Sequence, residues 1–562
     1  MLICGVKVTH DGGVALVDGN RLVFSTEVEK LNNNRRYSEL GDAAIIADIL
    51  GHQGYTLDDV DTFVVDGWGA IGAPGPETHE LYIPETRVTL ADGGQDHILR
   101  VARYRESPLR DDITKLRPFS GLHIRGRSYS YVSSLHVTGH ILGAYCASPF
   151  AERNEDAYVL VWDGGIFPTL YYVNSKRREV EGLGVLFRIS GNAYGMFARH
   201  FPPFRDADEH GLATAGKVMA FIATGQVRNP ILRALKVTTK DINDGHYDLP
   251  KRLARSVESQ LSSRDFTPAD YMATFHQFLQ DLLCVTLAQK LMAEPQRRRN
   301  LCIAGGCGLN IKWNTAVREI GILDEVFVPP FPNDAGSAIG AACTAMFVHG
   351  PRPNLDWSVY SGPSLVDELP GAGWESRACT IKELADLLHE TQAPVVFLNG
   401  RAEIGPRALG ARSILASAQS PIMTATLNRA KGRETYRPVS PICLEERASE
   451  IFEPGSPDPY MLFEHRVRPA WREKIPAVIH LDGTSRLQTV NAQENADLAE
   501  LLGAYTRLSG VPVLCNTSAN GPGRGFFPSV RSATDWGQVD YVWSNNMLHF
   551  HAQRLSGGGS PI

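Results

Sequence analysis

The stretch LICGVKVTHDGG (residues 2–13) reads as an apolar strand that ends in a His-Asp-Gly-Gly turn. Two strand-like runs within residues 14–25 follow it, and an Asp-Gly-Asn hairpin signal separates them. The stretch AYVLVWDGG (157–165) repeats this pattern, and another strand begins in 169–173. A strand, an Asp-Gly-Gly turn, a strand and then a helix, occurring twice, predict an internal duplication of one unit. Two coincidental Asp-Gly turns are the alternative, because Asp-Gly is common in hairpins.

The composition is that of a globular protein. The chain has 562 residues, of which 43% are apolar and 21% are charged, and its length favours about two to four domains. The net charge of −6 disfavours non-specific nucleic-acid binding, although it is compatible with a local basic groove. The nine cysteines are scattered and form no CxxC pair, which excludes a disulfide scaffold and a zinc ribbon.

The sequence shows no signal for the membrane or for secretion. It starts directly as a strand, without a basic segment followed by an apolar one, so we expect no secretory signal. No apolar run approaches about 18 residues, so we expect no transmembrane helix and no membrane partner. A cytoplasmic protein is the resulting expectation.

An α/β fold with two main domains is predicted. Residues 1–350 alternate strands and helices, and the Pro/Gly-rich stretch 351–375 is expected to be a linker. Residues 376–555 form a second α/β domain, and 556–562 a flexible tail. Helices are expected over 42–52, 134–148, 266–296, 333–348 and 380–392.

Two histidines and two aspartates suggest a metal site. His136 and His140 are four residues apart, which on a helix puts both imidazoles on one face. Asp163 and Asp334 each lie in a turn rich in small residues, where a carboxylate can reach a ligand. Imidazole and carboxylate together suit Fe(II), Zn(II) or Mn(II), and the sequence does not choose among them. An isolated HxxxH pair is more often two ordinary histidines.

The Gly-rich loop AGGCGLN (304–310) follows a buried strand, so its backbone N–H groups could approach phosphates. The loop matches neither a Walker A motif nor a GxGxxG fingerprint. By itself it is weak evidence, because Gly-rich turns are often only turns.

A second group of motifs is cationic. The string NGRAEIGPRALGARSIL (399–415) places three arginines after a buried strand, and KGRETYRP (431–438) adds three more cations. Asn516 follows another strand, and Arg524 lies in a Gly-Arg-Gly turn. Each could be a solvated charge run, but their shared placement after short strands favours a polyanion pocket, for example for ATP and a second phosphate compound. RNA fits less well, because aromatic residues are not interleaved with the cations.

At these residues the chain resembles the O-carbamoyltransferases of nodulation and antibiotic biosynthesis. The resemblance rests on the HDG, HxxxH and Asp-Gly-Gly motifs, the Gly-rich loop, the PNDAG turn (332–336), and above all the 399–415 string with the later NTS. It implies an N-terminal actin-like (ASKHA) domain and a C-terminal YrdC-like domain. The C-terminal domain would make carbamoyl adenylate from ATP and carbamoyl phosphate. The N-terminal domain would transfer the carbamoyl group to a hydroxyl of a small-molecule acceptor.

The resemblance also implies roles for individual residues. The metal, Fe(II) or another divalent first-row ion, would be bound by His136, His140, Asp163 and Asp334. The proton of the acceptor hydroxyl would be taken by His10. The nucleotide in the N-terminal domain would be held by Asp11, Gly164, Gly165, Gly305, Gly306 and Asn310. Carbamoyl phosphate and Mg-ATP in the C-terminal domain would be held by Arg407, Arg412, Lys431, Arg437, Asn516 and Arg524. A homodimer is the default oligomeric expectation.

Three other functions stay open at this point: an actin-like phosphotransferase, a tRNA threonylcarbamoyl transferase and a nucleotide-binding regulatory protein. The acceptor is not specified by the sequence. A polyketide macrolide, an aminoglycoside, a cephem and a lipo-oligosaccharide are all compatible acceptors. The expected lack of a membrane anchor and the modest size of the chain favour a diffusible small natural product. Several aromatic residues could line its site or simply cover the surface: Trp68, Tyr82, Tyr104, Tyr129 and Tyr131.

Overall fold

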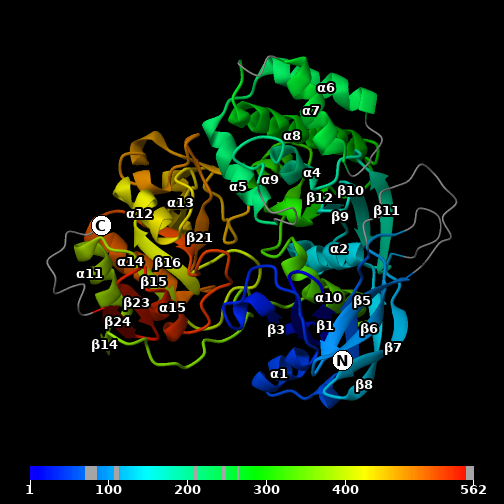
Figure 1. The fold of residues 1–562 in the computed structure, drawn as a ribbon, viewed down its shortest axis with the longest axis horizontal. Coiled ribbons are helices and arrows are strands. Elements are labelled where there is room, and N and C mark those ends of the chain that lie inside the picture. The colour runs from blue at the N-terminus through cyan, green and yellow to red at the C-terminus, as the bar shows by residue number, and fades with distance from the viewer. Residues whose placement is uncertain (70–84, 107–112, 207–211, 243–247, 262–264, 552–562) are drawn as a thin grey trace. The chain divides into compact units, whose positions relative to one another are not determined.

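A computed structural model describes residues 1–69, 85–106, 113–206, 212–242, 248–261 and 265–551 (Figure 1). The chain divides into two compact units. Unit 1 contains Met1–Ser25 and Tyr37–Trp357, and unit 2 contains Thr26–Arg36 and Ser358–Ile562. Tyr82 and the expected tail 556–562 lie outside the described residues.

Unit 1 is built on two mixed sheets. The first has the order β3-β2-β1-β4-β8-β7 and the second the order β11-β10-β9-β12-β13. The strands of the first are β1 (Leu2–Lys7), β2 (Gly13–Asp18), β3 (Arg21–Glu27), β4 (Thr62–Asp66), β7 (Arg117–Ile124) and β8 (Arg127–Ser134). The strands of the second are β9 (Ala157–Val161), β10 (Thr169–Asn174), β11 (Glu179–Val185), β12 (Asn300–Ala304) and β13 (Glu325–Phe327).

The two sheets share one topology. In each, the first three strands lie in reversed order, with the first antiparallel to the second. Two later strands then extend the sheet in parallel beyond the first: β4 and β8 beside β1, and β12 and β13 beside β9. This is the arrangement that the predicted duplication requires. The first sheet has one further strand, β7, which lies antiparallel to β8 and has no counterpart in the second sheet.

Helices α2 (His136–Cys146) and α10 (Ser337–His349) pack against each other at the centre of unit 1 (Figure 1). Helix α2 packs on β9 and β12, whereas α10 packs on β1, β2 and β4. Their close approach depends on glycine, because a Cβ atom on Gly340 would lie 2.2 Å from the carbonyl oxygen of Gly139. The spacing of these helices sets the distance between the residues that they carry.

The other elements of unit 1 surround this centre. The predicted long helix is present as α8, and it begins with a capping box in which Thr267 and Asp270 bind each other's backbone N–H groups. The other helices are α1 (Ala44–His52), α3 (Pro149–Glu152), α4 (Ala193–Ala198), α5 (Thr214–Phe221), α6 (Asn229–Ile242), α7 (Leu249–Gln260), α8 (Pro268–Met292) and α9 (Ile311–Arg318). A separate hairpin consists of β5 (Glu85–Asp92) and β6 (Gln95–Ala102).

Unit 2 is an eight-stranded mixed sheet with helices on both faces. Alternate residues face two different cores: Val395 and Phe397 pack with α11 and α14, while Val396 and Leu398 pack with α12, α13 and α15. In order across the sheet, the strands are β14 (Trp374–Ala378), β24 (Met547–His551), β23 (Tyr541–Ser544), β15 (Val395–Leu398), β16 (Arg412–Ser417), β22 (Val513–Ser518), β17 (Ser440–Leu444) and β21 (Gln488–Val490). The helices are α11 (Ile381–Thr391), α12 (Ile422–Ala430), α13 (Glu445–Ile451), α14 (Ala496–Ser509) and α15 (Val530–Trp536). A small sheet contains β18 (Phe452–Glu453), β19 (His465–Val467) and β20 (Thr484–Ser485).

The segment Thr26–Arg36 belongs to unit 2 although the chain on either side of it belongs to unit 1. The buried Lys30 ammonium donates to the carbonyl oxygens of Glu403 at 2.6 Å and Gly405 at 2.7 Å. The backbone N–H of Gly405 donates in turn to Glu27 Oε1 at 2.9 Å. The predicted domain over residues 1–350 assigned Thr26–Arg36 to the first domain, whereas in the structure this segment packs as part of unit 2.

Residues of the expected linker 351–375 make hydrogen bonds within both units. Leu355 donates its N–H to Cys146 in unit 1, whereas Gly362 donates to Ala402 in unit 2. Among the described residues, no helix combines the length and the apolar character needed to cross a membrane.

Candidate metal centre and anion site

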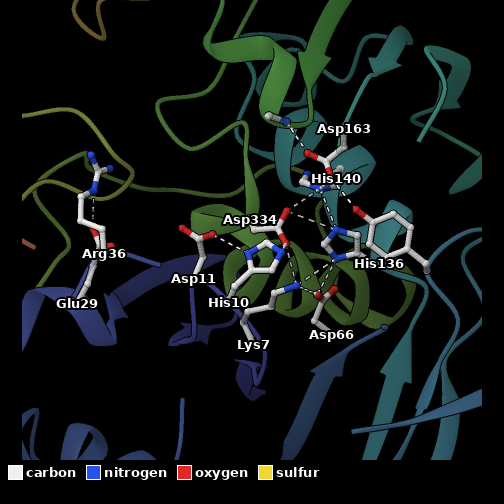
Figure 2. A network of polar contacts seen from close by, with 12 residues as sticks. Lys7, His10, Asp11, Glu29, Arg36, Asp66, His136, His140, Asp163 and Asp334 are labelled. Atoms are coloured by element: carbon white, nitrogen blue, oxygen red, sulfur yellow. Dashed lines mark hydrogen bonds and ion pairs between the residues drawn. The ribbon is translucent and has the colours of Figure 1, made fainter. Parts of the chain in front are cut away.

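The four residues predicted to bind a metal lie together in unit 1. His136, His140, Asp163 and Asp334 are all buried, and one potential ligand atom from each lies within 4.8 Å of the others (Figure 2). His136 is the first residue of α2 and His140 lies one turn further along. Asp163 lies two residues beyond the end of β9, and Asp334 lies in the turn before α10. The duplicated topology thus brings the ligands together from two equivalent sheets.

The two imidazoles and one carboxylate face each other at short distances. The Nε2 atoms of His136 and His140 are 3.2 Å apart. Oδ1 of Asp334 lies 3.5 Å from the first of these nitrogens and 3.4 Å from the second. Two imidazole nitrogens and a carboxylate oxygen converging in this way form a donor set suited to a divalent first-row metal.

A second layer of residues, which sequence reasoning missed, holds this set. Oδ2 of Asp66 lies 2.7 Å from Nδ1 of His136, so that Nε2 is left facing the cluster. The Lys7 ammonium lies 2.9 Å from the same Asp66 oxygen and 3.0 Å from Oδ2 of Asp334. The ring of Trp68 covers this ammonium at 4.2 Å. The signal in the sequence was a lysine inside an otherwise apolar strand.

Asp163 is held through both of its carboxylate oxygens. Oδ1 accepts the backbone N–H of Gly306 at 2.6 Å, and Oδ2 accepts the Tyr104 hydroxyl at 2.7 Å. The Tyr104 ring stacks on His136 with a centroid distance of 4.4 Å. Nε2 of His140 lies 3.9 Å from the Oδ2 atom. Of the aromatic residues noted in the sequence, Tyr104 and Trp68 therefore lie at this site.

Opposite charges dominate the electrostatics of the site. Burial alone would raise the pKa of Asp334, but Lys7, His136 and His10 outweigh it and hold the pKa well below its usual value. Burial alone would lower the pKa of His136, but Asp66 and Asp334 raise it to about 9. Carboxylates of this kind keep their negative charge and require a cation or protons beside them, which is the environment that a metal ion fits.

His10, the expected base, lies at the edge of this group. Its Nδ1 atom is 2.9 Å from Oδ2 of Asp11, and its Nε2 atom is 3.6 Å from Oδ2 of Asp334. The His10 side chain is 33% exposed, whereas those of Asp11 and Asp334 are buried. A substrate hydroxyl could therefore approach this imidazole from solvent.

The Gly-rich loop serves the same centre. Gly305 has φ of 86°, and a Cβ atom there would lie 2.4 Å from the carbonyl oxygen of Trp162, so only glycine fits. Gly306 donates its N–H to Asp163, and the Asn310 side chain caps the first turn of α9. The remaining residues expected to contact a nucleotide lie in the turns after β1 and β9: Asp11, Gly164 and Gly165. Nucleotide contact by any of these residues stays a prediction.

Unit 2 contains a cluster of buried and half-buried cations. The Lys431 ammonium is buried and donates to the backbone carbonyl oxygens of Ser518 at 2.5 Å and Asn520 at 2.6 Å, and also to Oδ1 of Asn520. Burial lowers the pKa of Lys431 well below its usual value, and the nearby charges of Arg433, Arg36 and Arg437 lower it further. Arg36, at the end of the Thr26–Arg36 segment, is also part of this cluster. It was not among the residues predicted to bind ATP and carbamoyl phosphate.

Two further arginines of this cluster were not among the predicted residues. The Nε and Nη2 atoms of Arg433 are buried and have no hydrogen-bond partner within the described parts of the chain. Burial, together with Arg437, lowers the pKa of Arg433 to about 10. Burial also lowers the pKa of Arg486, with contributions from Arg407, Arg433 and Arg437. Arg433 stands in the cationic 431–438 string, whereas no motif marks Arg486. A cluster that repels itself in this way is suited to a polyanion.

Arg412, predicted in the same pocket, is engaged by the protein itself. It is fully buried, and its guanidinium donates to four backbone carbonyl oxygens, those of Pro363, Asn399, Gly400 and Ala411. These bonds brace the loop that carries the neighbouring arginines.

Asn516 and Arg524 occupy different environments. Asn516 donates to Oε1 of Gln488 at 2.7 Å, and its own Oδ1 is buried without a partner in the described part of the chain. Arg524 is exposed and donates to the carbonyl oxygen of Asn33 at 3.2 Å. Asn516 thus has a free acceptor, while Arg524 attaches the Thr26–Arg36 segment.

Comparisons with known proteins agree over both units. A family model described as "Carbamoyltransferase N-terminus" matches residues 2–343, and one described as "Carbamoyltransferase C-terminus" matches residues 385–549. The chain is 46% identical to Nodulation protein U of Sinorhizobium fredii over 98% of this chain and 99% of that protein. It is also 46% identical to Nodulation protein U of Rhizobium tropici, over 99% and 97% of the two chains. It is 33% identical to a 3'-hydroxymethylcephem-O-carbamoyltransferase of Streptomyces clavuligerus over 94% of each chain.

Proposed function

The chain belongs to the carbamoyltransferase family, and from that premise we propose that it is an ATP-dependent O-carbamoyltransferase. It transfers a carbamoyl group to a hydroxyl of a small natural product. The observation that carries this proposal is that each unit holds a buried charged site, a His–Asp group in unit 1 and a cationic cluster in unit 2. The two sites suit two consecutive reactions of one enzyme.

Unit 2 activates the carbamoyl group. Water hydrolyses carbamoyl phosphate to carbamate and inorganic phosphate. A carbamate oxygen then bonds to the α-phosphorus of ATP and displaces pyrophosphate, which gives carbamoyl adenylate. The phosphates of Mg-ATP and of carbamoyl phosphate are bound by four cations of this unit: Arg407, Lys431, Arg433 and Arg437. The buried side-chain oxygen of Asn516 accepts a hydrogen bond from the amide group of the carbamate. A mixed sheet with helices on both faces supports the YrdC-like assignment of this unit.

Unit 1 performs the transfer. The duplicated topology of its two sheets supports an actin-like (ASKHA) fold. His10 takes the proton of the acceptor hydroxyl through Nε2 while Asp11 holds Nδ1. The hydroxyl oxygen bonds to the carbamoyl carbon, and AMP leaves from that carbon. The adenylate is bound by Asp11, Gly164, Gly165, Gly305, Gly306 and Asn310.

A divalent first-row metal, with Fe(II) as one candidate, is held by His136, His140, Asp163 and Asp334. When bound, it supplies positive charge that neutralises the phosphate of the leaving group. Tyr104 and Gly306 orient Asp163, and Asp66 orients His136, so the ligand set is organised by the protein itself.

The acceptor is a diffusible molecule that carries a hydroxyl group. The cephem relative is named for O-carbamoyl transfer to a hydroxymethyl group, which supports this class of acceptor. Trp68 packs against the half-exposed His10, and Tyr104 packs against Trp68. Both aromatic side chains can therefore line the path by which such a molecule approaches His10.

Product analysis tests the proposal. The purified chain is incubated with ATP and carbamoyl phosphate, without an acceptor, and the nucleotide products are separated. AMP and pyrophosphate that form only when both substrates are present support it. ADP would instead indicate a phosphotransferase, and tight ATP binding without turnover a regulatory protein. Threonylcarbamoylation of retained tRNA would indicate the nucleic-acid alternative.

A further inference from the structure

We propose that Lys7 is a positioning residue that matches the charge of the candidate metal centre to a divalent ion and presents one oxygen of Asp334 to it. This inference rests on the proposed function, because it concerns the metal centre of the transfer unit. It assigns a role to a residue that lies outside the four predicted ligands.

The two oxygens of Asp334 face different partners. Oδ1 lies 3.4 Å from Nε2 of His140 and 3.5 Å from Nε2 of His136. Oδ2 lies 3.0 Å from the Lys7 ammonium. The lysine therefore holds one oxygen away from the ligand group, so that this carboxylate would bind a metal through a single atom.

Lys7 also reaches the other side of the ligand group. Its ammonium lies 2.9 Å from Oδ2 of Asp66, the atom that accepts from Nδ1 of His136 (Figure 2). One cation thus contacts the carboxylate that orients an imidazole ligand and a carboxylate that is itself a ligand. Its position at the end of the central strand β1, rather than on a loop, fixes it relative to both.

Water does not screen this charge. The Lys7 side chain is 1% exposed, and those of Asp66 and Asp334 are 1% and 4% exposed. The ring of Trp68 covers the ammonium at 4.2 Å. In such surroundings a unit charge a few ångströms from a metal has a large effect on which metal binds.

The charges of the buried groups match a divalent ion. Asp66, Asp163 and Asp334 are the three buried carboxylates that contact the imidazole ligands, and Lys7 is the buried ammonium that contacts two of them. The buried Asp11 carboxylate pairs with His10 at the edge of this group. When the imidazoles of His136 and His140 are neutral, these three carboxylates and the Lys7 ammonium together carry two negative charges. A divalent cation brings the group to neutrality, whereas a trivalent cation would leave an excess positive charge in a buried site.

Selectivity between Zn(II) and Ga(III), neither of which changes oxidation state here, tests this charge matching. The full chain is dialysed against nitrilotriacetate buffers of each metal, and bound metal is measured to give a ratio of affinities. The variants are Lys7→Met, Asp66→Asn and the double variant. Lys30→Met serves as the matched control, because Lys30 is an equally buried lysine in unit 2.

Each variant has a defined expected result. Lys7→Met raises the Ga(III)/Zn(II) affinity ratio by roughly 100-fold, because one positive charge is removed at close range. Asp66→Asn lowers the ratio, the double variant restores it to within about threefold, and Lys30→Met leaves it unchanged. A purely structural role would not produce opposite shifts that cancel.

The outcomes separate this inference from the proposed function. An unchanged ratio in Lys7→Met, or a double variant that does not return toward the native ratio, overturns the role of Lys7. Should Lys7→Met not fold, the lowered ratio in Asp66→Asn still tests the charge relation, and an unlowered one overturns it. If the native chain binds neither metal, or His140→Ala binds both as the native chain does, the metal centre itself is wrong.

Discussion

Nδ1 of His136 and Oδ2 of Asp66 are 2.7 Å apart, and both side chains are fully buried. A carboxylate at this distance keeps the proton on Nδ1 and leaves Nε2 available as a ligand atom. Asp66 belongs to β4 and His136 to α2, so this pair connects the first sheet to the helix that carries two predicted ligands.

Asp66→Ala should lower the affinity for a divalent metal by about 10- to 100-fold, because the orienting carboxylate of His136 is lost. Equilibrium dialysis against Zn(II) buffers measures this change. Asp61→Ala is the control, since Asp61 is a nearby exposed aspartate that binds the backbone N–H of Leu2. Equal affinities of native chain and Asp66→Ala would mean that this pair does not organise the ligand.

Gly340→Ala should both destabilise unit 1 and weaken metal binding. The added methyl group would lie 2.2 Å from the Gly139 carbonyl oxygen, so helices α2 and α10 must separate. We expect a loss of about 1–3 kcal/mol in the free energy of unfolding, measured by denaturant titration. Gly51→Ala in α1 is the control, because nothing lies within 4 Å of a Cβ atom there. Similar effects of both changes would argue against a spacing role for Gly340.

His140→Ala should abolish carbamoyl transfer and leave adenylation in unit 2 largely intact. The reason is that His140 lies in the ligand group of unit 1, while the cationic cluster lies in unit 2. Separate assays of AMP formation and of acceptor carbamoylation measure the two steps. Loss of both steps in a folded variant would contradict the division of labour.

Lys431→Met should have the opposite effect. It removes a buried ammonium from the cationic cluster, so adenylation is lost while the ligand group of unit 1 is unchanged. Supplied carbamoyl adenylate should restore carbamoylation of the acceptor. Failure of this rescue, with metal binding intact, would show that Lys431 also serves the transfer step.

Local patterns predicted much of unit 1. The strand and Asp-Gly-Gly repeat indicated the duplication, and the spacing of His136 and His140 indicated their shared helix face. The clustering of these histidines with the aspartates depends on the packing of α2 against α10, which no single motif contains. The exchange of Thr26–Arg36 into unit 2 was not predicted, because it rests on contacts such as Lys30 with Glu403, which are far apart in sequence.

The arginines show why the anion site was harder to predict. Arg412 and Arg433 look alike as cations in glycine-containing strings. In the structure Arg412 donates to backbone carbonyl oxygens, whereas two nitrogens of Arg433 lack a partner in the described residues. Whether an arginine braces the backbone or is left to bind a ligand depends on the tertiary environment of its guanidinium. The periodicity of the sequence carries no information about that environment.

Arg433→Gln should raise the melting temperature of the ligand-free chain and weaken anion binding. Removing one of several mutually repelling buried cations relieves repulsion in the empty site, while the bound anion loses a charge-assisted hydrogen bond. We expect about 10- to 100-fold weaker binding of pyrophosphate, measured by calorimetry, and a smaller thermal shift on its addition.

Arg447→Gln is the matched control, because Arg447 is a half-exposed arginine of unit 2 that pairs with Glu450. It should lower stability by at most about 1 kcal/mol and leave pyrophosphate binding unchanged. If Arg433→Gln destabilised the ligand-free chain and bound pyrophosphate as the native chain does, Arg433 would be a structural residue and the anion site would lie elsewhere.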